Sequence, residues 1–97
     1  MFSWLDAKPA QAFGEELAKF VMDEIPSADR VKEGKFAAKA LKTLERADRK
    51  VSEFKAKHPL NFYKRAKLAN AFLWGLKDAG CPDAYSDQLT EWLSFRL

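Results

Sequence analysis

The feature that most constrains the fold of this chain is an amphipathic pattern that runs from Gly34 to His58. Its apolar residues recur at steps of three and four, the spacing that places side chains on one side of an α-helix. They are Ala37, Ala40, Leu44, Ala47, Val51 and Phe54. The pattern predicts one helix from Lys35 to Lys57, which ends at His58 because the residue before Pro59 is driven out of the helical region. Such a helix must bury one face against the rest of the chain.

Basic residues gather on the opposite side of the same segment. At about 100° per residue, seven cations share this side, interrupted only by Glu53; they are Lys35, Lys39, Lys42, Arg46, Arg49, Lys50 and Lys57. We call these seven residues the basic face. A face that is merely solvated usually mixes both signs of charge, although lysine is also a favourable residue on any exposed helix surface. Two interpretations are therefore open: a solvated face, or a binding site for an anionic partner.

Three other segments also have helical periodicity. A first helix is predicted over about 9–25, with Pro26 preventing its continuation. The last helix begins at 82 or 83 and runs to 95, after Gly80 has ended the segment before it. That preceding segment, about 60–79, is the most apolar in the chain, and we predict it to be the most buried helix. Its apolar side chains form two stripes, one of Phe62, Ala66, Ala69, Leu73 and Leu76, the other of Leu68, Phe72 and Trp74.

These segments predict an all-α fold, a single-domain antiparallel bundle of about four helices joined by short turns over residues 1–97. Gly14 and Gly75 lie inside predicted helices, where they allow close approach of a neighbouring helix. Residues 1–8 include Trp4 and other bulky apolar side chains. We expect Trp4 to pack against the bundle, and a loosely packed segment over 1–8 is the alternative.

The composition favours a cytoplasmic protein. No apolar run approaches the roughly 18–20 residues of a membrane span, and residues 1–8 lack the basic start and apolar stretch of a signal peptide. Cys81 is the only cysteine, which excludes an internal disulfide. The net charge of +3 conceals a segregation along the chain, because residues 1–29 carry −4, residues 30–67 carry +9 and residues 68–97 carry −2.

Little in the sequence indicates catalysis. The single histidine, His58, is expected to be a cap or hinge residue before Pro59, and Cys81 a packed residue after a helix end. Neither has a second ligand or base near it in sequence, so we expect no metal, no cofactor and no nucleophile. Adjacent carboxylates such as Glu15 and Glu16 point in different directions on a helix. We therefore expect a protein that is not an enzyme.

The leading hypothesis is a small binding module whose basic face contacts nucleic acid or an acidic protein. Because most aromatic residues, Tyr63 excepted, fall within apolar stripes, contact with the phosphate backbone is favoured over base reading. The alternative is a structural or adaptor protein that acts through an apolar patch or self-associates into a homo-oligomer. Its patch would consist of Phe2, Trp4, Phe95 and Leu97. A third possibility is binding at a membrane surface, which would use both features.

Overall fold

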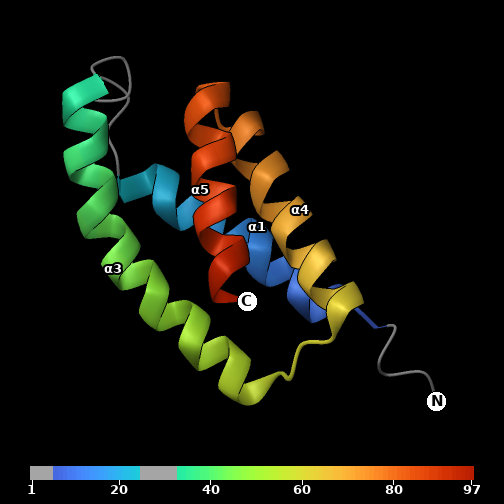
Figure 1. The fold of residues 1–97 in the computed structure, drawn as a ribbon. Coiled ribbons are helices and arrows are strands. Elements are labelled where there is room, and N and C mark those ends of the chain that lie inside the picture. Colours follow the sequence, from blue (N-terminus) through green and yellow to red (C-terminus); the bar gives the residue numbers. More distant parts are fainter. Residues whose placement is uncertain (1–5, 25–32) are drawn as a thin grey trace.

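The computed structural model describes residues 6–24 and 33–97, with side chains described over 6–24 and 41–97. The described residues form helices and turns without a strand (Figure 1), and the helices are α1 (Lys8–Glu24), α3 (Glu33–Lys57), α4 (Phe62–Asp78) and α5 (Asp83–Arg96). The prediction of an all-α bundle of about four helices is confirmed. Residues 1–5, with Phe2 and Trp4, lie outside the described part of the chain.

Local chemistry ends the helices where the sequence predicts. The Asn61 side chain accepts a hydrogen bond from the backbone N–H of Lys64 at 2.8 Å, which caps the start of α4. Gly80 has a φ of 90°, the left-handed conformation that glycine adopts readily after a helix. The amide of Cys81 then donates to the carbonyl of Leu76 at 3.0 Å and closes the turn towards α5. These caps fix both ends of α4.

Helix α1 packs against both α3 and α4, and α4 also packs against α5. Figure 1 shows α3 and α4 along the two edges of the molecule, with α1 behind α5 and between them. The α1 face towards its neighbours is buried at Ala10, Gly14, Leu17, Ala18, Val21 and Met22. Helix α1 is therefore the helix against which both α3 and α4 pack.

Two glycines let α1 and α4 approach backbone to backbone. A Cβ atom added at Gly14 would lie 2.4 Å from the carbonyl oxygen of Leu68, and one added at Gly75 would lie 2.7 Å from the Cβ of Ala18. Real Cβ contacts do not occur at such distances, so only glycine fits at either position. The predicted close approach of helices at these residues is confirmed.

The prediction that the third helix is the most buried is wrong. Helix α4 buries Leu68, Ala71, Phe72 and Leu76, a shorter set than that of α1. Phe62 from the first predicted stripe is 83% exposed, and Trp74 from the second is 54% exposed. The reason is that, among the described helices, α4 packs mainly against α1 and α5, so the parts of its apolar surface that lie beyond these two contacts remain open to solvent.

The described part of α3 buries the face that its periodicity predicts. Ala47 and Val51 are buried, and Leu44 and Phe54 pack half-buried against the core; the side chains of Ala37 and Ala40 lie outside the described set. Its other flank reaches α5, where Arg96 Nε lies 3.2 Å from Asp48 Oδ1. Among the helices described, none combines the length and the apolar content needed to cross a membrane.

Candidate functional site

The basic face lies along an uninterrupted helix, α3. The side chains of Lys35 and Lys39 are outside the described set. The other five members are all exposed, and they are Lys42, Arg46, Arg49, Lys50 and Lys57. They divide into cations that form an ion pair or a cation–π contact with α1 and cations that form neither.

Two members of the basic face are engaged by α1. Arg46 Nη1 forms an ion pair with Glu24 Oε1, and the side chain of Arg46 is 62% exposed. The Lys50 ammonium lies 4.7 Å from the centroid of the Phe20 ring, a cation–π contact. An exposed ion pair contributes about 0–1 kcal/mol, and an exposed cation–π contact about 0.5–1 kcal/mol. Both contacts help to hold α3 on α1. They are weak enough for Arg46 and Lys50 to exchange them for contacts with an anionic ligand.

The other three described members, Lys42, Arg49 and Lys57, are exposed and are not part of an ion pair with the described side chains. From Lys42 to Lys57 the helix rises roughly 22 Å, at 1.5 Å per residue. Glu45, Asp48 and Glu53 are also exposed within this stretch, and Asp48 pairs with Arg96 of α5. Six cations therefore stand against three carboxylates from residue 42 to residue 57, a net excess of positive charge.

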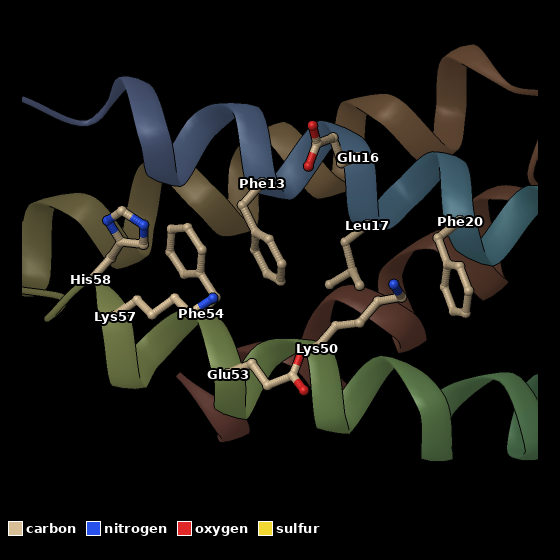
Figure 2. Close-up of a pocket in the computed structure, with 9 residues that line it drawn as sticks. All are labelled: Phe13, Glu16, Leu17, Phe20, Lys50, Glu53, Phe54, Lys57 and His58. Carbon is tan, nitrogen blue, oxygen red and sulfur yellow. The ribbon is translucent and has the colours of Figure 1, made fainter.

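A groove of about 350 Å³ lies beside these cations, between α1 and α3 (Figure 2). This volume is at the lower end of the range of about 300–1,000 Å³ for small-molecule pockets. Four apolar side chains and five polar ones line it: Phe13, Leu17, Phe20 and Phe54, with Glu16, Lys50, Glu53, Lys57 and His58. Lys50 and Lys57 belong both to the groove and to the basic face, so the two features are continuous.

Stacked rings close one end of the groove. Phe13 of α1 stacks on Phe54 of α3 with centroids 4.3 Å apart and ring planes at 14°. The other neighbour of Phe54 is His58, at 4.7 Å and 25°. His58 thus follows the last turn of α3, as its position before Pro59 predicts, with its ring against an aromatic neighbour.

The groove is the feature that sequence reasoning missed. Periodicity correctly assigned Phe13, Phe20 and Phe54 to apolar faces, yet all three are only half-buried and present part of their rings to the groove. The spacing of residues on α1 and α3 could have indicated the groove. Phe13 and Phe20 are seven residues apart on α1, and Lys50 and Lys57 are seven residues apart on α3, so each pair lies two turns apart on one side of its helix.

The described side chains include no group of three or more His, Cys, Asp or Glu residues that could hold a metal ion. Glu15 and Glu16 line different cavities, one beside α4 and the other in the groove, as expected for neighbours on a helix. Cys81 is buried beneath the turn between α4 and α5. The chemistry that this site offers is recognition of negative charge and of flat apolar groups.

Comparison of the chain with protein-family models, with curated proteins and with solved structures gives no significant match. Its function must therefore be argued from its own residues.

Proposed function

We propose that this protein is a small non-catalytic binding module that contacts an anionic partner, nucleic acid or an acidic protein, through the basic face of α3. The observation that carries the proposal is that Lys42, Arg49 and Lys57 are exposed and form no ion pair within the described part of the chain. Cations that are buried or already paired would interact only weakly with an anionic partner. Exposed cations along one helix are already arranged for a partner.

The length of the basic face suits a polyanion. Duplex DNA carries one negative charge per about 1.7 Å of axis, so the roughly 22 Å between Lys42 and Lys57 faces several phosphates. Such binding is independent of sequence and falls with salt, with a slope in log K against log salt of about −0.9 for each phosphate neutralised on B-DNA. An acidic protein would show a similar loss, because exposed charges are screened beyond about 8 Å at physiological ionic strength.

The test is a titration of labelled duplex and single-stranded oligonucleotides, with heparin and polyglutamate as further polyanions. In the double variant Lys42→Glu, Arg49→Glu, affinity for the bound polyanion should fall at least tenfold at low salt. The matched control is Lys8→Glu, Lys19→Glu, which reverses two exposed lysines on α1 that do not line the groove. It should bind nearly as the unmodified chain does. An equal loss in both variants would show that only net charge matters and would contradict the proposal.

A second candidate rests on exposed aromatic residues near the end of α5. Phe95 is 80% exposed and Phe62 83% exposed, and bulky apolar side chains in the open are typical of association surfaces. Between α4 and α5 lies a largely apolar groove of about 290 Å³, lined by Phe62, Arg65, Ala66, Ala69, Ser94 and Leu97. These residues support the adaptor or homo-oligomer alternative through Phe95 and Leu97, while Phe2 and Trp4 lie outside the described residues.

Gel filtration at two salt concentrations separates the two candidates. Association through apolar side chains persists or strengthens as salt rises, whereas ionic association weakens. A salt-resistant oligomer that Phe95→Ser converts to a monomer would favour the second candidate. Pelleting of the chain with anionic lipid vesicles, but not with oligonucleotides, would favour a membrane surface.

A further inference from the structure

We infer that the groove between α1 and α3 binds a nucleobase, so that the anionic partner is a single-stranded nucleic acid. The inference rests on the proposed function, because the phosphates of such a strand need the basic face of α3. It names a nucleobase as the occupant of the groove, and it selects single-stranded nucleic acid from among the anionic partners.

The ring of Phe20 offers a stacking surface to a flat group. Phe13 and Phe20 lie seven residues apart on α1, and Figure 2 shows them on either side of Leu17 in the groove. Because Leu17 lies between the two rings and Phe13 is stacked on Phe54, a planar ring would stack on the accessible part of Phe20, at the distance of about 4.5–7 Å usual for aromatic pairs. Both phenylalanines are half-buried, so the bundle holds them in place while they keep surface in the groove.

Lys50 now occupies a contact that a base would take. Its ammonium lies 4.7 Å from the centroid of the Phe20 ring and is exposed to solvent. Stacking of a base on an aromatic ring is typically stronger than an exposed cation–π contact. A base entering beside Phe20 therefore displaces the ammonium, which then becomes available to the phosphate attached to the same nucleotide.

The charges separate the base from its phosphate. The groove is lined by equal numbers of carboxylates and ammonium groups, Glu16 and Glu53 against Lys50 and Lys57, so a phosphate gains little by entering it. Outside the groove, Lys42 and Arg49 on the same helix have no acidic partner among the described side chains. The base therefore enters the groove, and the backbone follows α3.

A duplex and an acidic protein fit the same surface less well. Bases in a duplex are paired and stacked, and a base must be extruded before it can enter a pocket. An acidic protein supplies charge along α3 but no regular succession of flat rings. Single-stranded binding proteins combine these two elements, a basic track and aromatic stacking positions.

The carboxylates also predict a preference among bases. Adenine, cytosine and guanine each carry an exocyclic amino group that donates hydrogen bonds, and thymine carries none. Glu16 and Glu53 are acceptors in the groove. Cytosine strands should therefore bind more tightly than thymine strands of the same length.

The experiment measures fluorescence anisotropy of labelled strands of about ten nucleotides, within the site sizes of about 4–16 known for single-strand binding folds. The probes are oligo-dC, oligo-dT, an abasic sugar-phosphate strand and a duplex of equal length. We expect oligo-dC to bind about tenfold more tightly than the abasic strand and severalfold more tightly than oligo-dT. This comparison uses the unmodified chain and needs no variant to fold.

The variant Phe20→Leu removes a stacking surface and keeps an apolar side chain. It should lower affinity for oligo-dC about tenfold and leave binding of the abasic strand and the duplex unchanged. The matched control is Phe95→Leu, which alters an exposed phenylalanine on α5 and should bind as the unmodified chain does. Thermal melts by circular dichroism verify that both variants are folded.

The failures are distinguishable. If oligo-dC and the abasic strand bind equally, and Lys42→Glu, Arg49→Glu weakens both, the nucleobase site is refuted while the proposed anion-binding function stands. If polyglutamate binds and no strand does, the partner is an acidic protein and the nucleobase site is also refuted. If no polyanion binds at low salt, the proposed function fails and this inference fails with it.

Discussion

Helix α1 meets its two neighbours, α4 and α3, in opposite ways. Towards α4 it offers Gly14 and Ala18, and the two backbones approach so closely that a methyl group at Gly14 would collide with the carbonyl of Leu68. Towards α3 it offers larger side chains, which form the Phe13–Phe54 stack, the Arg46–Glu24 ion pair and the Lys50–Phe20 contact and leave a groove of about 350 Å³. One interface is filled, and the other retains space.

The difference separates stability from recognition. Close packing of buried apolar atoms supplies most of the favourable free energy of folding, and a filled interface has no room for a ligand. Beside the buried Ala47 and Val51 of α3, the α1–α3 interface uses exposed charges and half-buried rings, which contribute little stability each. Those same groups are accessible to a partner. We therefore expect stability to depend mainly on the α1–α4 interface, whereas the proposed binding would use the α1–α3 interface.

The largest expected effect is that of Phe72→Ala at the filled interface. Phe72 is fully buried, and truncation of a buried phenylalanine typically costs about 3–5 kcal/mol. Phe20→Ala, at the open interface and half-buried, should cost clearly less. Urea unfolding of both variants measures the difference, and equal losses would contradict the contrast between the two interfaces.

A smaller effect is expected from Gly14→Ala. Alanine is favoured over glycine in a helix by about 1 kcal/mol, but here its Cβ would lie 2.4 Å from a backbone oxygen of α4. Overpacking of this kind typically costs about 1–3 kcal/mol, so the net change should be destabilising. A rise in the midpoint of thermal unfolding would show that the helices separate without cost and that the interface is not tightly filled.

The smallest effect is expected from the ion pair at the open interface. A double-mutant cycle with Glu24→Gln and Arg46→Gln should give a coupling free energy below about 1 kcal/mol, because the Arg46 side chain is 62% exposed. The coupling should shrink further in 1 M salt, where the Debye length is about 3 Å. A coupling of several kcal/mol would mean that the α1–α3 interface holds its helix as strongly as the α1–α4 interface does.

The helices and the composition of their faces can be predicted from the sequence alone. Periodicity predicted α3 to within two residues of its observed start at Glu33, and the caps at Asn61 and Gly80 act on their own neighbours in the chain. The segregation of cations on α3 is likewise a consequence of residue spacing on one helix. All of these depend on interactions within a few residues, which a sequence displays directly.

Which face of a helix meets which neighbour depends on how the helices pack together. Spacing shows that Phe62 and Trp74 lie on apolar stripes of α4, but their exposure depends on where α1 and α5 cover that helix. Which cations are paired, and the existence of a groove with Phe13, Phe20 and Lys50 along it, depend on how closely α3 approaches α1. Periodicity orders side chains around one axis, whereas burial and cavities arise from the distances between axes.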